Sequence, residues 1–325
     1  MPWQNTRDPY RVWLSEIMLQ QTQVSTVTPY YEKFLARFPT LAALAAAPTE
    51  AVMGLWSGLG YYARARNLHA CAQIVMREHG GEFPREAEAI AQLPGIGRST
   101  ASSIAAFCFG ARTPILDGNV KRVMTRHFGI DGFPGQPAVE RRLWALAESL
   151  TPLRDVDIYN QAQMDLGSLI CTRTKPDCEG CPVNASCVAK KEGRIAELPA
   201  KKPRRTTPER EVTLLMLVRD GSVLLELRPP SGIWGGLLSL PELPVAADAT
   251  HHAQSALGCR VIKWQQLPLL THTFTHFRLH ISTLCAEVKS VSGAALENTQ
   301  RWLLLDNLED APLPAPIRTL LNSRP

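Results

Sequence analysis

Four cysteines close together in the sequence are the side chains most clearly suited to chemistry. Cys171, Cys178, Cys181 and Cys187 are spaced C-x6-C-x2-C-x5-C within 17 residues. Thiolates at such short separations can close around one metal centre. The loop 171–187 therefore predicts a metal site. The remaining cysteines stand among apolar residues and are predicted to pack in the core: Cys71, Cys108, Cys259 and Cys285.

A glycine-containing hairpin precedes the cysteines. Leu93-Pro94-Gly95-Ile96-Gly97 leads directly into a predicted helix over 98–109. Pro94 cannot continue a helix, whereas Gly95 and Gly97 permit positive φ angles that would strain other residues. The free N–H groups and the positive dipole end of the next helix suit a phosphate. The stretch has the form of a helix-hairpin-helix DNA-binding element, but an ordinary glycine turn between helices would look the same.

An aspartate follows the hairpin at Asp117, just before another predicted helix. An aspartate in this position often serves only as an N-cap. A carboxylate near a DNA-binding hairpin is also well placed to stabilise a positively charged sugar. The residues alone leave both roles open.

The bulk composition limits the class of protein. At 325 residues, two domains are expected. The net charge of +5 and pI near 8.8 are compatible with a polyanionic partner. No apolar run is long enough to span a bilayer, and the N-terminus lacks the apolar stretch of a signal peptide. We therefore expect a cytoplasmic protein without a membrane partner, associated with the nucleoid in a bacterium. Its thiols would stay reduced, which favours metal over disulfides.

Two types of secondary structure must position these residues. The first half reads as short helices: one from Asp8-Pro9 to about 21, one from Thr28-Pro29 to Pro39, one from about 61 to Gly80-Gly81, and one over 98–109. Later runs read as strands at 212–218, 223–227, 266–270 and 279–288, with helices at 247–257 and 315–322. The predicted domains are helical (1–197) and α+β (211–325), joined by a basic, proline-rich linker (198–210). The linker is either merely solvated or faces phosphates.

At this point the residues resemble a known family. The hairpin at 93–97 with Asp117 resembles the helix-hairpin-helix superfamily of DNA base-excision glycosylases. The cysteine loop is similar to that of its iron–sulfur branches, endonuclease III and MutY. The resemblance implies one [4Fe–4S] cluster with a structural or redox-sensing role. Zinc is the alternative, but zinc spacing usually comes as two CxxC pairs.

Four longer stretches look specifically like the MutY adenine glycosylases: 13–24, 58–68, 114–123 and 228–236. Bifunctional members of the superfamily have a lysine nucleophile at the position of Ser99, where a hydroxyl cannot form an imine. The resemblance therefore implies a monofunctional glycosylase that uses water and leaves an abasic site. Lys121 is more readily interpreted as a phosphate or solvent contact than as a substitute nucleophile.

The resemblance also assigns the chemistry. Glu16 matches the family's catalytic glutamate and would protonate the purine, for which a desolvated pocket must raise its pKa. Asp117 would stay ionised and face the sugar cation, and Asn119 would orient that site. A helical wheel alone places Glu16 opposite the apolar face, as a solvated glutamate. Trp3 is expected either beside the adenine pocket or in the core.

Base excision requires the target nucleotide to be flipped out of the duplex, which leaves a gap that a wedge must fill. Gln21 and Tyr61 match the family's intercalating residues, although Tyr61 without the family would be read as core. The other residues expected to contact DNA are Gln20, Thr22, Leu59, Gly95, Gly97, Ser99 and Lys121.

The C-terminal half resembles the family's Nudix-like domain, which recognises 8-oxoguanine. Residues 240–262 contain no Arg-Glu or Glu-Glu pair of the kind that binds magnesium, so no pyrophosphatase activity is expected. Phe274-Thr275-His276 matches the family's Phe-Ser-His loop, with threonine in place of serine. The family usually has a helix before Pro2-Trp3-Gln4, whereas this chain starts almost at that motif.

The predicted function is removal of adenine mispaired with 8-oxoguanine or guanine in double-stranded DNA, by a monomer. One alternative is an endonuclease III-like glycosylase with lyase activity. Another is a non-catalytic iron–sulfur protein that binds DNA, and a third is a zinc-stabilised nucleotide hydrolase.

Overall fold

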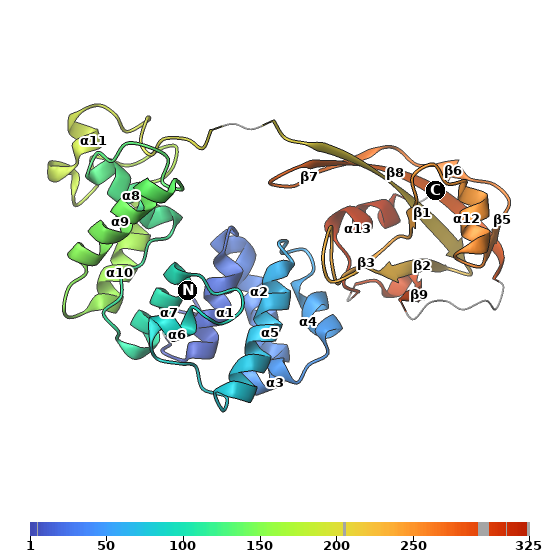
Figure 1. Cartoon of the computed structure of the whole chain (residues 1–325), viewed down its shortest axis with the longest axis horizontal. Helices are drawn as coiled ribbons and strands as arrows, with labels where there is room; N and C mark the ends of the chain where they lie inside the picture. The colour runs from blue at the N-terminus through green and yellow to red at the C-terminus, as the bar shows by residue number, and fades with distance from the viewer. Residues whose placement is uncertain (5, 204–205, 292–298, 310, 324–325) are drawn as a thin grey trace. The chain divides into compact units, whose positions relative to one another are not determined.

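The computed structural model describes residues 1–325 except 5, 204–205, 292–298, 310 and 324–325. The chain divides into two compact units (Figure 1). The first consists of residues 1–31, 40–45 and 70–204, and the second of residues 32–39, 46–69 and 205–325. The domain boundaries expected from the sequence remain a prediction.

Helices dominate the chain up to Lys191. In chain order they are α1 (Pro9–Leu19), α2 (Val24–Arg37), α3 (Leu41–Ala45), α4 (Thr49–Trp56), α5 (Ala63–Glu78), α6 (Ala87–Ile90), α7 (Arg98–Phe109), α8 (Gly118–His127), α9 (Pro137–Leu150), α10 (Val156–Asp165), the π-helical turn η1 (Leu166–Ile170), the 3₁₀ turn η2 (Asn184–Ser186) and α11 (Val188–Lys191). No helix in the described ranges is long and apolar enough to cross a membrane.

Helix boundaries follow local signals at most of the predicted positions. The Asp8 carboxylate accepts a hydrogen bond from the Tyr10 N–H at 2.9 Å, and Pro9 opens α1. The helix α7 has the predicted bounds. The prediction that Thr28-Pro29 opens α2 was wrong: the helix begins at Val24, and Pro29 lies inside it. The Gln23 carbonyl accepts the first bonds of α2, from the Thr26 and Val27 N–H groups, so the missing N–H of Pro29 falls in the second turn.

The first unit has a core between α8 and α9. Val120 and Met124 of α8 pack against Leu143 and Ala147 of α9, and Leu116 joins them from the segment before α8. This segment belongs to no strand and leads directly into the predicted helix after Asp117. The packing fixes the start of α8, where Asp117 is the N-cap.

The second unit contains a mixed sheet. Its strands are β1 (Glu209–Arg219), β2 (Ser222–Leu227), β3 (Leu238–Ser239), β4 (Glu242–Leu243), β5 (Cys259–Val261), β6 (Gln265–Gln266), β7 (Leu270–Thr273), β8 (Arg278–Val291) and β9 (Gln300–Leu304). Within the described ranges the strand order is β3-β2-β1-β8-β5, with β4, β6, β7 and β9 pairing onto this path. The central pair, β1 and β8, is parallel.

Alternating side chains of the sheet form its core. Leu215 and Leu217 of β1 pack with Ala253 and Leu257, which lie in and just after helix α12 (Ala249–Ser255). A second helix, α13 (Ala315–Asn322), lies where the sequence predicts it. The predicted β1–β2 hairpin is confirmed, with Asp220 and Gly221 both at positive φ.

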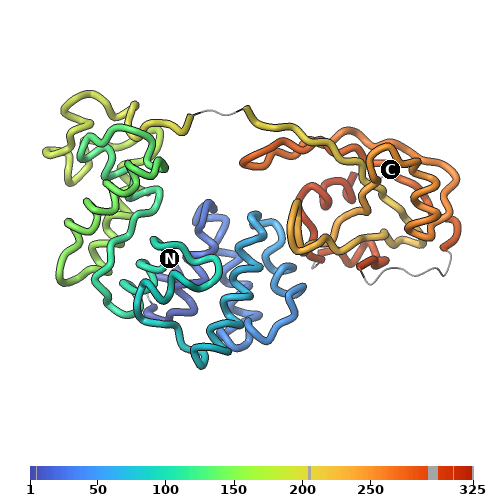
Figure 2. Tube along the Cα trace, viewed as in Figure 1, coloured from blue at the N-terminus to red at the C-terminus, as the bar shows by residue number. Residues whose placement is uncertain are grey.

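The strand predicted at 266–270 was wrong in part, because β6 ends at Gln266 and β7 begins at Leu270. Both short strands pair with β8, and the trace in Figure 2 follows β7 and β8 as one hairpin. Phe274 closes the tip of this hairpin by donating its N–H to the Phe277 carbonyl at 2.9 Å.

Candidate active site

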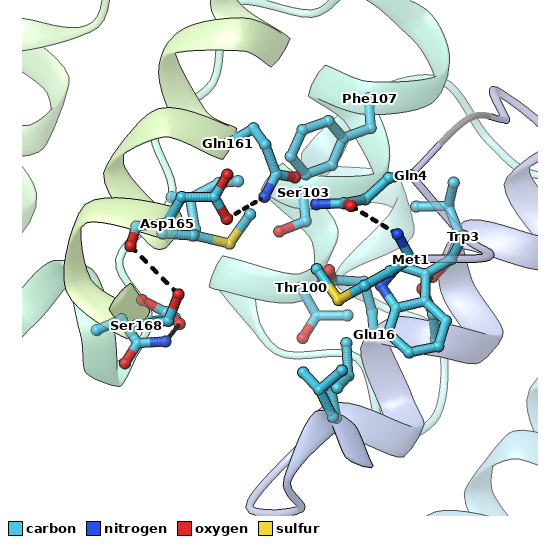
Figure 3. Close-up of a pocket in the computed structure, with 18 of the residues that line it drawn as sticks. Met1, Trp3, Gln4, Glu16, Thr100, Ser103, Phe107, Gln161, Asp165 and Ser168 are labelled. Carbon is cyan, nitrogen blue, oxygen red and sulfur yellow. Dashed lines mark hydrogen bonds between the residues drawn. The ribbon is translucent and has the colours of Figure 1, made fainter. Parts of the chain in front are cut away.

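A pocket of about 1220 Å³ lies within the first unit. Its wall is formed by α1, α7, the start of α8, α10 and η1 (Figure 3). In Figure 3, Trp3 and Glu16 lie on one side of the pocket, and Gln161 and Asp165 lie on the other. The volume is sufficient for a flipped-out base with part of its sugar. Trp3 fits both of its expected roles, because it lines the pocket and is also buried, 5.1 Å from the Tyr31 ring.

Glu16 projects from α1 into this pocket, so the solvated position given by the helical wheel was wrong. The pKa of Glu16 is raised to about 7, chiefly by burial; a hydrogen bond with the Ser103 side chain lowers it, and the charge of Asp117 adds to the rise. A carboxyl group with this pKa carries a proton over much of the neutral range. It can therefore act as a general acid at neutral pH.

Asp117 lies on the same pocket as the N-cap of α8. Its carboxylate accepts hydrogen bonds from the Val120 N–H at 2.7 Å and from the Asn119 side-chain amide at 3.3 Å. Burial raises the pKa of Asp117, while these hydrogen bonds and the charge of Arg122 lower it. The two roles left open by the sequence are thus compatible: one oxygen caps the helix, and the carboxylate still borders the pocket.

Arg122 connects the Asp117 side of the pocket to the cysteine loop. Its guanidinium donates to the Asn119 side-chain carbonyl at 3.0 Å, the Gly167 carbonyl at 2.5 Å and the Cys171 carbonyl at 2.7 Å. Gly167 packs directly on the start of α8, where an added Cβ would lie 2.7 Å from the Asn119 Cβ and 3.0 Å from its backbone. A side chain at residue 167 would therefore displace Asn119 or η1.

Arg122, Ser103 and Gly167 were not identified from the sequence. Arg122 stands three residues after Asn119, a spacing that places both on one helix face. Gly167 interrupts a helical stretch, which often marks a close approach of backbones. These two signals could have found Arg122 and Gly167. No local signal points to Ser103.

The hairpin at 93–97 leads into α7 as expected. The Ile96 N–H donates to the Leu93 carbonyl at 3.2 Å, and Gly95 has a φ of 75°. Gly97 has a φ of −87°, so the positive φ that both glycines permit is adopted at Gly95 and not at Gly97. Ser99 lines the pocket, and its hydroxyl accepts a hydrogen bond from the Leu116 N–H at 3.2 Å. This bond ties α7 to the segment that leads into Asp117.

Lys121 forms an ion pair with Glu140. Its ammonium group lies 2.5 Å from a Glu140 oxygen, and both side chains are partly exposed. Attack by this amine on a sugar would first have to break the ion pair with Glu140. The contact argues against Lys121 as a substitute for the missing lysine at residue 99.

The cysteine loop folds around Arg126, a buried arginine of α8. Arg126 donates to the Cys171 sulfur at 3.3 Å and to the Thr172 carbonyl at 2.8 Å, and the Cys187 thiol donates to the Arg126 carbonyl at 3.6 Å. Burial raises the pKa of Cys178, as do the charges of the other three cysteines. The contacts of Arg126 bring the first and the last cysteine of the loop, Cys171 and Cys187, to the same arginine. Among the described side chains, however, no group of three or more Cys, His, Asp or Glu is arranged to hold a metal ion.

The expected wedge residues have an unusual backbone conformation. Gln21 in the first unit has a φ of 58° and is exposed, and Gln20 and Thr22 beside it are partly exposed. Tyr61 in the second unit has a φ of 49° and a side chain 44% exposed, whereas Leu59 is buried. Residues other than glycine rarely adopt positive φ, and such strain occurs often at functional sites.

The expected lesion-sensing loop is an aromatic cluster at the β7–β8 tip. The Phe274 ring stacks on Phe277 at 4.4 Å between centroids, and the His276 ring lies 4.8 Å from Phe277. The Thr275 hydroxyl lies 3.3 Å from the His276 Nδ1. Thr275 and His276 are exposed, so both are accessible to a ligand.

Comparison with known proteins places the fold and the pocket in context. Residues 14–149 match the HhH-GPD superfamily of base excision DNA repair proteins, and residues 212–323 match the NUDIX domain. The adenine DNA glycosylase of Buchnera aphidicola subsp. Acyrthosiphon pisum is 35% identical over 99% of this chain and 92% of its own. The adenine DNA glycosylase of Homo sapiens is 39% identical over 95% of this chain and 57% of its own. A thermostable thymine-DNA glycosylase is similar in structure, with a TM-score of 0.55 and 31% identity over 59% of this chain and 88% of its own.

Proposed function

The chain belongs to the adenine DNA glycosylase family, and from this premise we propose that it hydrolyses the N-glycosidic bond of adenine paired with 8-oxoguanine or guanine, leaving an abasic site. As a member of the family it is an adenine-specific DNA glycosylase and acts on DNA. The observation that best supports the mechanism is the raised pKa of Glu16 in a pocket shared with Asp117.

The two carboxyl groups have different tasks in the proposed reaction. Glu16 donates its proton to a ring nitrogen of the adenine, so that the base leaves as a neutral group when the bond to the sugar breaks. The ionised carboxylate of Asp117 stabilises the positive charge that develops on the sugar. Water then adds to the sugar carbon and gives its proton to the Glu16 carboxylate, which restores the acid. Asn119, held by Arg122, keeps the Asp117 carboxylate in position.

Contacts with DNA would come from several elements. The start of α7, with Gly95, Gly97 and Ser99, offers N–H groups to a phosphate. Gln21 of the first unit, next to Gln20 and Thr22, and Tyr61 of the second unit, near Leu59, would each act as a wedge in the DNA after the adenine is flipped. Ser99 has no amine and Lys121 is paired with Glu140, so the strand would not be cleaved. Double-stranded DNA is then the partner of a monomer.

The aromatic cluster at the β7–β8 tip would recognise the base opposite adenine. The ring of Phe274 can stack on a base, and the Thr275 hydroxyl and the His276 ring can form hydrogen bonds. Relative to the serine expected at residue 275, the threonine keeps the hydroxyl and adds a methyl group. We therefore expect 8-oxoguanine recognition to be retained with an altered fit.

The four cysteines Cys171, Cys178, Cys181 and Cys187 would hold one [4Fe–4S] cluster, which supplies structural stability and electron exchange when bound. The contacts of Arg126 with both Cys171 and Cys187 support this assignment. Arg126 would donate a hydrogen bond to one ligand sulfur and keep the loop on α8. Iron and sulfide analysis with visible absorbance of the purified protein tests the cluster independently of activity. A colourless protein containing zinc would contradict it.

A labelled duplex with one 8-oxoguanine·adenine pair tests the reaction. We expect a break at the adenine only after hot alkali. A break without alkali would instead support the endonuclease III-like alternative with lyase activity. Binding without any break, in a protein that carries its cluster, would support a non-catalytic DNA-binding role.

A further inference from the structure

The turn between α4 and α5 presents Tyr61 in a strained conformation. Residues 57–62 connect Trp56 to Ala63, and Gly58, Gly60 and Tyr61 have φ angles of 94°, 77° and 49°. Glycine tolerates such angles, but a tyrosine does not adopt them without compensation. Tyr61 is nonetheless 44% exposed, so burial of the residue does not supply that compensation.

Arg64, in the first turn of α5, contacts the turn at several points. One terminal nitrogen of its guanidinium donates to the Leu59 carbonyl at 3.3 Å and to the Gly60 carbonyl at 3.2 Å. Its guanidinium carbon lies 5.5 Å from the centre of the Tyr61 ring and 5.3 Å from the Trp56 ring. The Trp56 indole N–H also donates to the Gly60 carbonyl, at 3.2 Å.

These contacts involve a buried charge. Arg64 is only 8% exposed, and burial lowers its pKa to about 10, which leaves it charged at neutral pH. Cation–π contacts and hydrogen bonds from a charged donor are stronger when desolvated. The planar guanidinium can stack on a ring and donate to a carbonyl at once, which a lysine ammonium cannot do in the same geometry.

We infer that Arg64 is a positioning residue that holds Tyr61 in its left-handed, exposed conformation before DNA arrives. The inference rests on the proposed role of Tyr61 as a wedge. A preformed wedge needs no ordering when it enters the duplex, so Arg64 would lower the barrier to base flipping without touching adenine. Its loss should slow flipping and leave the acid–base chemistry at Glu16 and Asp117 intact.

The test compares wild type, Arg64→Lys, Tyr61→Leu and the double variant. Stopped-flow fluorescence of 2-aminopurine beside the target adenine, opposite 8-oxoguanine, reports flipping, and single-turnover excision is measured across pH. We expect Arg64→Lys to slow the fluorescence change by about tenfold without altering the shape of the pH profile. In the Tyr61→Leu background, Arg64→Lys should add little, because both act through one ring.

Arg37→Lys is the matched control, since Arg37 is an exposed arginine 5.9 Å from the Phe38 ring. The flipping rate and the excision rate of Arg37→Lys should equal those of wild type. Two results would overturn the inference. One is a wild-type flipping rate in Arg64→Lys. The other is a double variant in which the flipping rate falls by the product of the two single-variant factors. Absence of both excision and fluorescence change in wild type would instead reject the proposed function.

Thermal unfolding of each variant separates a local effect from loss of the fold. If Arg64→Lys is unfolded, Trp56→Phe provides a second test, because it removes the indole donor to Gly60 and leaves Arg64 in place. Slower flipping in Trp56→Phe that disappears in the Tyr61→Leu background would support the inference. Flipping at the wild-type rate would refute it.

Discussion

Glu16→Gln should abolish excision and at the same time stabilise the protein above neutral pH. Burial holds the pKa of Glu16 at about 7, so ionising this side chain is less favourable in the folded than in the unfolded chain. The stabilisation from protonated Glu16 is fully present below the unfolded-state pKa. It is lost as pH rises through the folded-state pKa of about 7. A glutamine at this position cannot ionise and avoids the loss.

The magnitude follows from the two pKa values. Raising a carboxyl pKa from 4.5 to about 7 corresponds to roughly 3 kcal/mol of unfolding free energy, at about 1.36 kcal/mol per pKa unit. Glu16 keeps some exposure to the pocket, so this figure is an upper value. Near pH 4.5 the variant and wild type should differ only by the changed hydrogen bond to Ser103. By pH 8.5 the variant should be more stable by up to about 3 kcal/mol.

Urea unfolding at a series of pH values measures this difference, and hydrogen exchange of the α1 amides assigns it to the region of Glu16. Titrating groups other than Asp117, whose charge interacts with Glu16, contribute equally in the two proteins and cancel. Glu82→Gln, at an exposed position, controls for the loss of one glutamate. A stability difference that does not change between pH 4.5 and 8.5, or a wild type that is the more stable at high pH, would refute the reasoning.

Other predictions concern the rest of the site. Single-turnover excision by wild type should fall as pH rises through about 7, because protonated Glu16 is then lost; a rate that rises over this range would exclude Glu16 as the acid. Asp117→Asn should keep helix α8, since asparagine also caps helices, but lower the excision rate by at least about 100-fold, which circular dichroism and excision assays check together. Gly167→Ala should cost about 1–3 kcal/mol and slow excision, because its Cβ meets Asn119; unchanged unfolding and excision would contradict this packing. Ser99→Lys should introduce strand cleavage without alkali, detectable by borohydride trapping of the imine.

Local signals were sufficient for much of the fold. Asp8 and Pro9 mark the start of α1, and the turn at Asp220 and Gly221 fixes the β1–β2 hairpin. Strand β9 and the pairing of β1 with β8 were not predicted. Both depend on partners far away in the sequence, which periodicity along one segment does not report.

The periodicity of one segment also failed to predict where the candidate site residues lie. A helical wheel separates side chains that face the core from those that face solvent. Glu16 faces a polar pocket inside the protein, so the wheel assigned it to the wrong class. The resemblance to a family identified Glu16 and Asp117 by position, but not the contacts of Arg122 with the carbonyls of Gly167 and Cys171, which lie 45 and 49 residues away.

The parallel pairing of β1 with β8 also has a consequence for biosynthesis. In the register Leu214↔Thr283 to Leu217↔Ala286, one edge of β1 gains its partner strand only after β8 has been made. A ribosome releases the helices up to Lys191 well before that point. The nascent chain therefore carries β1 with one edge unpaired for the time needed to translate the segment between β1 and β8. Premature termination in this interval should yield aggregating chains, more readily than termination before β1.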